Sequence, residues 1–578
     1  MSKYRFLFTA LTLTLLSCFS SCESIDLDQT EDPSGVNPKF LDPITAFNFV
    51  QLEFEAYINS NNGFTQEVTR QLAMTSGNNY SNAYTPANFN LNWDEAYGIL
   101  NAVKFMEPKS IEKKEFYALG AAKVIESYVL MTLADTYGDV PYSEALLGIK
   151  KLDPKFDKSA DIYIKALSNL DVAIGYLTNT NSSTKNVFDL FYTSKNKWVT
   201  LANTMKLRMY NNARNAGSEI GIADIKTAMN SIIAANDIID NPDEDFSFKY
   251  GAKRANPNTR HPLYNRQYEL GGGDYIANYM FWTMAQEKII TPGTSPTVQT
   301  DPRTSFYFLR RDGNPSDDSE FVLPRKNRPE HYNETRYASF YDQAVRTPFL
   351  VSNWLGIGSL PSGGFWGRDH GNADGIPQDN EKRTVCGLYP IGGKYESNNL
   401  TTSFSPSGTE GALGAGILPI MMSSFVHFIK AEAILTIGVN GVAKDEFLLG
   451  VNASIDRVAT PINNYPILST SAIATINTQQ TNYVSYLSTR YDALTDAKKL
   501  EMIVKEYFIA AWGNGIEPYN NYRRTGYPSN FQPTLEPISG QFYATALYPQ
   551  VSVGSNLNAP ANVQTKKVFW DKLNIELK

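Results

Sequence analysis

The stretch EFYALGAAKVIESYVLMTLADTYGDVPYSEAL, from Glu115 to Leu146, decides the fold class of this chain. Up to Tyr137 its apolar residues recur at every third or fourth position, which is the period of a long helix with one buried face. The residues of this apolar face are Ala118, Ala122, Ile125, Val129 and Leu133. Gly138 and Pro141 end the periodic pattern, so the sequence predicts a helix that stops at Tyr137.

The end of the stretch, TYGDVPYSEAL, predicts a tight corner. Gly138 suits the end of a helix, and Asp139 or Ser143 can cap the element that follows. We therefore interpret this segment as structural.

Three more segments have the same helical period. They run from Lys195 to Asn212, from Met422 to Ala433 and from Ala497 to Trp512. Antiparallel helices of this kind can stack as tetratricopeptide-like pairs, although no strict repeat period is visible. The sequence predicts a mainly α fold in which such pairs support the rest of the chain.

Between Phe246 and Ser405 the helical period fades, and glycine, proline, asparagine and aromatic residues crowd together. A long loop region on a helical scaffold is where binding groups are usually displayed. The run GTEGALGAG, Gly408 to Gly416, lacks the preceding strand that a phosphate-binding loop needs, and we expect a flexible approach to the next helix.

The N-terminus has the pattern of a bacterial lipoprotein export signal. Lys3 and Arg5 precede an apolar run that is too short to span a bilayer, and small residues then lead to Cys22. We expect a signal peptide over residues 1–21, a lipid on Cys22 and an acidic tether over residues 22–40. Cys18 is the rival lipid site, but Cys22 follows a longer apolar segment and opens the acidic tether.

Composition limits the classes of function. The chain of 578 residues has 52 basic and 59 acidic residues, and removing the signal peptide moves the formal net charge from −7 to −9. No basic stripe offers phosphate contacts, so nucleic acid is not an expected partner. Cys386 is the one cysteine outside the signal region, which excludes an intramolecular disulfide framework. No linker divides the chain, and we expect one domain over residues 41–578.

No motif for catalysis stands out. The four histidines are scattered without the spacing of metal ligands, and the chain has neither a nucleophile elbow nor a Walker loop. Asp369, Asp374 and Asp379 could supply the carboxylate pair of a glycosidase, but acidic residues are too common for this to identify an enzyme. We predict a protein that is not an enzyme and that needs no cofactor.

Asp369, Asn372 and Asp374, followed by Gly375, offer oxygen ligands in a tight turn. Calcium prefers such ligands, but His370 stands where a standard calcium loop would begin with aspartate. A turn held by Asx hydrogen bonds is the favoured interpretation, and calcium is the alternative.

Six segments in order resemble the SusD/RagB family. They are TYGDVPYSEAL (136–146), WVTLANTMKLRMYNNAR (198–214), DPR (301–303), GFWGRDHGNADGIPQDN (364–380), AEA (431–433) and NNYRRTGYP (520–528). The tether, in which Asp32 and Pro33 follow Cys22, is also similar to that of these lipoproteins, and the SusD-like branch fits best. One departure lies at Pro518, Tyr519 and Asn520, where the family usually has an aromatic residue just before the arginine pair.

This resemblance implies a SusD-like fold and a lipoprotein on the outer face of the outer membrane. It also implies a partner, a SusC-like TonB-dependent transporter, over which such proteins act as a lid that captures a nutrient. The family's recognition loops vary too much between members to be transferred residue by residue.

An oligosaccharide site needs exposed aromatic rings flanked by polar groups, because sugars present apolar C–H faces bounded by hydroxyls. Two regions supply this mixture. The candidate ligand-binding residues are Asn78, Asn79, Tyr80 and Tyr84 in the first region, and Trp354, Trp366, Arg368 and Asp369 in the second. Trp93 resembles a core position of the family and is left out.

The alternatives to oligosaccharide capture stay open in the sequence. An oligopeptide-capturing lid would use backbone hydrogen bonds and polar groups more than an aromatic platform. A surface glycan hydrolase and a structural lid without ligand selectivity are further alternatives.

Arg523 and Arg524 are predicted to form an internal strut after a helix. Their guanidinium planes can stack on neighbouring tyrosines, and a buried carboxylate on an apolar helix needs a counter-charge. The candidate partners are Glu432 and Glu506, with stacking on Tyr519, Tyr522 and Tyr527.

Overall fold

The computed structural model describes most of the helical scaffold and parts of the central region. The described residues are 42–74, 80–264, 266, 274–285, 287–291, 297–299, 301–309, 370–371, 384–386, 388–389, 411–459, 470–532, 534 and 541–578. The predictions of a signal peptide, of lipidation at Cys22 or Cys18 and of an acidic tether fall outside these residues.

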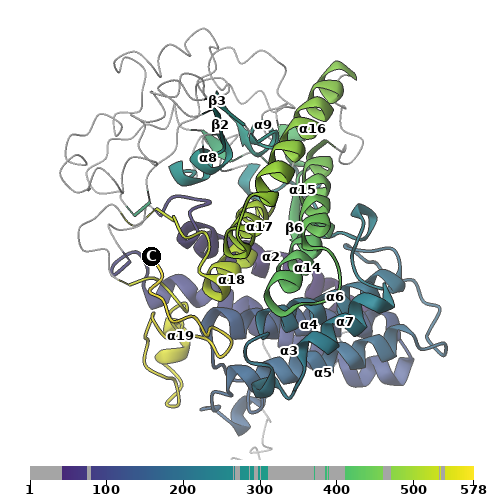
Figure 1. Ribbon diagram of the computed structural model, residues 1–578. Coiled ribbons are helices and arrows are strands. Elements are labelled where there is room, and N and C mark those ends of the chain that lie inside the picture. Colours follow the sequence, from purple (N-terminus) through teal and green to yellow (C-terminus); the bar gives the residue numbers. More distant parts are fainter. Residues whose placement is uncertain are drawn as a thin grey trace, which may run out of the picture.

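Successive helices of the N-terminal half pack against one another in chain order (Figure 1). They are α2 (Pro43–Val68), α3 (Asn90–Lys113), α4 (Phe116–Tyr137), α5 (Ser159–Leu177), α6 (Lys195–Asn212) and α7 (Ile225–Ala235). Short 3-10 turns lie between or after them: η2 (Pro86–Phe89), η3 (Gly148–Lys150), η4 (Gly217–Ile220) and η5 (Pro242–Glu244). The prediction of a mainly α fold with tetratricopeptide-like helix pairs is confirmed.

Helix α4 is the centre of this layer. It ends at Tyr137 as predicted, and Gly138 follows it with a φ of +83°, a conformation that other residues rarely adopt. The helix is long and apolar enough to span a membrane, but 89% of its apolar window is buried inside the protein. It packs between α3 and α5, and it is therefore the core helix of the scaffold.

The segment TYGDVPYSEAL forms the predicted corner. The Asp157 carboxylate accepts hydrogen bonds from the backbone N–H groups of Tyr142 (2.9 Å) and Ser143 (2.7 Å). The Asp139 carboxylate accepts from the N–H of Ser159 (2.9 Å), the first residue of α5. Asp139 therefore caps the next helix, as one of the two sequence alternatives requires.

A second group of helices covers the C-terminal part. It contains α14 (Ser423–Ile437), α15 (Ala443–Ala459), α16 (Thr470–Asp492), α17 (Asp496–Ala510), α18 (Ile516–Thr525) and the short α19 (Gln550–Val553). Helix α14 packs on α15, α17 and α6, and α18 packs on α2. One hydrophobic core joins the two groups.

The described strands are short and form three antiparallel pairs. They are β1 (Phe246–Lys249) with β6 (Ile417–Met421), β2 (Ile289–Thr291) with β3 (Thr297–Val298), and β4 (Phe308–Leu309) with β5 (Val385–Cys386). Helices α8 (Asn278–Ala285) and α9 (Thr304–Tyr307) lie near β2 and β3 in Figure 1.

The region before α14 differs from the prediction. Within the run from Gly408 to Gly416, residues 411–414 form a 3-10 turn, η10 (Gly411–Gly414), and residues 408–410 lie outside the described part of the chain. The element that follows the run is the buried strand β6, not the expected helix. The apolar run of residues 417–421 is too short for its periodicity to distinguish a buried strand from a helix. Its pairing with β1 makes it a strand.

The predicted arginine strut is present, with two corrections. Arg524 forms a two-pronged ion pair with Glu432, at 2.7 and 2.6 Å, and Arg523 lies 3.7 Å from the ring centroid of Tyr519. Both arginines lie within α18, not after a helix. Glu506 pairs instead with Arg303, at 2.6 Å.

Candidate functional site

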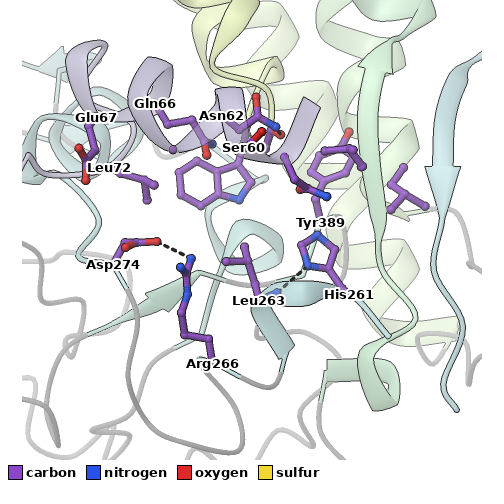
Figure 2. Close-up of a pocket in the computed structure, with 16 residues that line it drawn as sticks. Ser60, Asn62, Gln66, Glu67, Leu72, His261, Leu263, Arg266, Asp274 and Tyr389 are labelled. Atoms are coloured by element: carbon purple, nitrogen blue, oxygen red, sulfur yellow. Dashed lines mark hydrogen bonds and ion pairs between the residues drawn. The ribbon is translucent and has the colours of Figure 1, made fainter. Parts of the chain in front are cut away.

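A cavity of about 290 Å³ opens beside the C-terminal end of α2 (Figure 2). This volume is near the lower end of small-molecule sites, which is about 300 Å³. Its walls come from α2, from His261, Leu263, Arg266 and Asp274, from β6 and from the chain just after α17. The lining residues are Asn59, Ser60, Asn62, Gly63, Gln66, Glu67, Leu72, His261, Leu263, Arg266, Asp274, Tyr389, Ile417, Leu418, Trp512 and Gly513.

Helix α2 supplies the polar wall. Its lining positions repeat every three or four residues, so one face of the last turns of the helix is directed at the cavity. The helix forms here despite a run of weak helix formers, because its other faces pack on α3, α4 and α18. Asn62 anchors this wall: its amide group donates to the Gly513 carbonyl (2.9 Å) and accepts from the Gly515 N–H (3.0 Å).

The chain after α17 supplies the apolar wall. Trp512 is buried and packs edge-on against Phe308, with ring centroids 5.0 Å apart. Gly513 follows with a φ of +88°, which lets the chain turn back toward α2. Leu418 of β6 and Tyr389 complete this side of the cavity.

Three ionisable side chains meet at one end of the cavity. Arg266 and Asp274 form an ion pair of 2.7 Å, and Figure 2 shows Glu67 facing them from α2. Burial raises the pKa of the Glu67 carboxyl to about 8; a hydrogen bond from the Tyr84 hydroxyl lowers it, the Asp274 charge raises it and the Arg266 charge lowers it. Glu67 is therefore mostly protonated at neutral pH.

His261 lies on the other side of the cavity (Figure 2). Its Nδ1 accepts a hydrogen bond from the Leu263 N–H (3.1 Å), which fixes the neutral tautomer with the proton on Nε2. Burial, together with the nearby Arg266 charge, lowers its pKa to about 3. His261 therefore stays uncharged across the physiological range.

The cavity is consequently polar but close to electrically neutral. Glu67 and His261 are uncharged at neutral pH, and Arg266 balances Asp274. Amides, a hydroxyl and a protonated carboxyl lie opposite aromatic and aliphatic side chains. This combination suits an uncharged ligand that has both hydroxyl groups and apolar faces.

The structure places Tyr80 in the core. Its ring is 2% exposed, and its hydroxyl lies 2.8 Å from Nε2 of His370. The expectation that Tyr80 presents an exposed ring to a ligand is therefore wrong, because the ring is enclosed by Phe542 and Tyr543.

Tyr84 lies behind the cavity wall. Its ring packs on Phe64 and Tyr543, with centroids 5.1 and 5.4 Å away, and its hydroxyl donates to Glu67. Tyr84 thus holds a cavity-lining carboxyl in place, but its ring does not form an open platform.

The other candidate ligand-binding residues lie outside the described residues, and their roles stay predictions. They are Asn78, Asn79, Trp354, Trp366, Arg368 and Asp369. The calcium candidates Asp369, Asn372 and Asp374 are outside as well. Among the residues that the structure describes, no group of three or more metal-ligating side chains is placed to hold a metal ion.

The structure brings the two predicted ligand regions together at one point. His370 contacts Tyr80, and the Gly371 N–H donates to the carbonyl of Met74 (3.2 Å). Residues directly after Asp369 therefore pack against residues of the first region.

The polar face of α2 was missed by the sequence analysis. The run Asn59, Ser60, Asn61, Asn62, Gly63 interrupts an otherwise amphipathic helix, and this interruption is the signal that marks the cavity wall. Five lining residues, in contrast, come from the loop-rich region that was expected to display binding groups: His261, Leu263, Arg266, Asp274 and Tyr389.

Comparison with known proteins supports the family resemblance. Residues 37–343, more than half of the chain, match the SusD-like family described as "Starch-binding associating with outer membrane". Residues 394–552 match the family described as "Susd and RagB outer membrane lipoprotein". No protein with a curated description matches the chain in sequence.

Solved structures share the fold along nearly the whole chain. A SusD homolog from Bacteroides uniformis is 17% identical with a TM-score of 0.59, and the match covers 91% of this chain and 99% of that one. A SusD/RagB family protein from Bacteroides thetaiotaomicron is 16% identical with a TM-score of 0.61, covering 92% and 99%. A chitin-binding SusD homolog from Flavobacterium johnsoniae is 17% identical with a TM-score of 0.59, also covering 92% and 99%.

At such identities these structures show the fold alone, whereas the two sequence matches identify the family and its outer-membrane location. The chain belongs to the SusD/RagB family of outer-membrane lipoproteins.

Proposed function

We propose that this chain is a cell-surface lipoprotein, anchored through Cys22, that captures oligosaccharides and passes them to a SusC-like TonB-dependent transporter. Family membership supports a nutrient-binding role at the outer membrane. A chitin-binding homolog has the same fold, which makes a glycan a reasonable first ligand class. In this proposal the protein binds its ligand without catalysing a reaction and needs no cofactor.

The observation that carries the oligosaccharide assignment is the near-neutral cavity beside α2. A sugar ring offers hydroxyl groups to the polar wall, including Asn59 and Gln66, and a C–H face to the wall that contains Trp512 and Leu418. The protonated Glu67 can donate a hydrogen bond, and its raised pKa avoids a buried charge beside an uncharged ligand.

An oligopeptide is the second candidate, and one observation favours it. The Arg266–Asp274 ion pair at the cavity edge is half-exposed, and its two charges could exchange partners with the carboxylate and ammonium groups of a peptide.

The test is a binding screen of the chain without its signal peptide and with Cys22→Ser, by calorimetry and gel retardation. Neutral oligosaccharides and peptide mixtures are the two arms, and release of reducing ends is measured in parallel. Saccharide binding without release supports the proposal. Peptide binding alone supports the second candidate, and reducing-end release identifies a hydrolase. Co-purification of the lipidated protein with a barrel transporter tests the partner.

A further inference from the structure

A surface outside the cavity exposes aliphatic side chains on the segment after Leu146 and on α19 with the loop that follows it. We call it the loop surface and define it by Leu147, Ile149, Leu152, Val551 and Leu557. Ile149 is 93% exposed, Leu152 is 75% exposed and Leu557 is 90% exposed, values that only a protruding side chain reaches. Single exposed aliphatic residues are common, but a cluster of this kind marks an interaction site.

Hydrogen bonds fix the two segments to each other. The Leu557 N–H donates to the Asp153 carboxylate (2.8 Å), and the side-chain amide of Asn556 donates to the carbonyl of Pro154 (2.8 Å). The Lys104 ammonium group donates to the carbonyl of Leu146 (2.7 Å) and ties the first segment to α3. The aliphatic side chains are thus presented on a built surface.

Lysines lie on the first of the two segments only. Residues 144–158 contain four lysines against three acidic residues. Each acid is engaged within the protein: Glu144 pairs with Lys151 (3.1 Å), Asp157 with Lys155 (3.6 Å), and Asp153 accepts the Leu557 N–H. Lys150 is exposed and has no ion-pair partner among the described residues. The first segment of the loop surface is therefore apolar and carries a net charge of about +1.

The start of the described chain lies beside the C-terminal end of α3, the helix to which Lys104 ties the loop surface. Asp42 pairs with Lys113 (3.3 Å) at the C-terminal end of α3, which is about 14 Å along the helix from Lys104. Twenty residues separate Cys22 from Asp42 and span at most about 70 Å. A lipid on Cys22 therefore keeps the loop surface within reach of the membrane. This step rests on the proposed function, in which Cys22 is the anchor. The exposure of the aliphatic side chains is observed independently of that anchor.

We propose that the loop surface rests on the lipid surface of the outer membrane, with Ile149, Leu152 and Leu557 entering the boundary between head groups and acyl chains. Protruding aliphatic residues with flanking lysines suit a fluid anionic surface, which needs no matching pockets. A folded protein partner would need a pocket for each protruding side chain. In Figure 1, α19 lies at the lower left of the molecule, away from α8, β2 and β3.

The test uses the chain without its signal peptide and with Cys22→Ser, sedimented with vesicles of phosphatidylethanolamine and phosphatidylglycerol. The test variant carries Ile149→Asp, Leu152→Asp and Leu557→Asp. The matched control carries Phe188→Asp, Val442→Asp and Ile575→Asp, three exposed apolar residues outside the loop surface. Both variants replace exposed side chains, and melting temperatures verify that they fold.

The parent chain is expected to sediment with vesicles, the test variant to bind at least about tenfold more weakly, and the control variant to bind like the parent. Lys150→Glu with Lys151→Glu should weaken binding to these vesicles but not to phosphatidylcholine vesicles. Failure of the parent chain to bind, or equal binding by the test variant, overturns the proposal. The assay contains neither sugar nor transporter, so its result is independent of ligand capture.

Discussion

The imidazole Nε2 of His370 lies 2.8 Å from the hydroxyl oxygen of Tyr80, and both side chains are buried. This hydrogen bond joins the first predicted ligand region, to which Tyr80 belongs, to the residue directly after Asp369 of the second. The bond gives Tyr80 a structural role, because without the Tyr80 hydroxyl the buried Nε2 of His370 would have no hydrogen-bond partner there.

We therefore expect Tyr80→Phe to lower the free energy of unfolding by about 1–3 kcal/mol, the cost of a buried polar group left unpaired. Denaturant unfolding measures it. Ligand affinity should stay within about twofold of the parent value, since the ring itself is retained. Unchanged stability with lost affinity would instead make Tyr80 a ligand residue.

Arg524→Ala should lower the free energy of unfolding by about 3 kcal/mol, the lower end for a broken buried ion pair, because the buried Glu432 carboxylate loses its two-pronged partner and keeps Arg214 at 2.6 Å. Lys572→Ala is the matched control: its ion pair with Glu219 is exposed, and the expected loss is below about 1 kcal/mol. Thermal and denaturant melts compare the two variants. A similar effect from both would show that the strut does not carry stability.

The same pair predicts sensitivity to acid. Burial raises the pKa of Glu432, but the Arg524 and Arg214 charges outweigh burial and hold it at about 2, below the ordinary value of 4.5. The ionised carboxylate thus contributes about 3 kcal/mol above pH 4.5, and this contribution is lost as pH falls from 4.5 through 2.

In Glu432→Gln the corresponding part of the acid dependence should vanish. Unfolding free energies measured across this pH range check it, and an unchanged slope in the variant would contradict the assignment.

Ligand affinity should fall as pH rises through about 8. Below that value Glu67 is protonated and can donate to an uncharged ligand; above it the carboxylate is charged, lies near Asp274 and has lost its donor. Glu67→Gln keeps a neutral donor at every pH, and its affinity should be flat over this range. Calorimetry at a series of pH values compares the two proteins; parallel profiles would exclude Glu67 as the titrating group.

Helix α6 illustrates what could be predicted from the sequence. Its bounds, Lys195 and Asn212, are those expected from the apolar period, because this period is a local property of the chain. The pairing of Glu432 with Arg524 was also predictable, since a buried carboxylate needs a counter-charge. Glu506 obeys the same rule, but the sequence contains no distances that could single out Arg303 as its partner.

The cavity was less predictable for physical reasons. Asn, Ser and Gly compete with helical hydrogen bonds, so the run from Asn59 to Gly63 resembles the end of a helix, and only packing against other helices extends α2 through it. The prediction that the Tyr80 ring is exposed was wrong because a tyrosine among polar residues has the same sequence pattern whether its hydroxyl bonds to water or to a buried histidine.

The most direct test of ligand capture is to fill the cavity. Gly63 lies on α2 at the cavity wall, and a Cβ built there meets nothing within 4 Å. Gly63→Phe should therefore occupy the cavity without a clash in the scaffold. Gly175→Phe on α5 is the matched control, because it is also helical, exposed and open, but lies away from the cavity.

The decisive measurement is calorimetric titration of an oligosaccharide, chosen from the binding screen, into the parent chain, Gly63→Phe and Gly175→Phe. Gly63→Phe is expected to bind at least about a hundredfold more weakly than the parent, while Gly175→Phe binds like the parent and both variants stay folded. Equal saccharide affinity in all three proteins would contradict the assignment of the ligand site to this cavity.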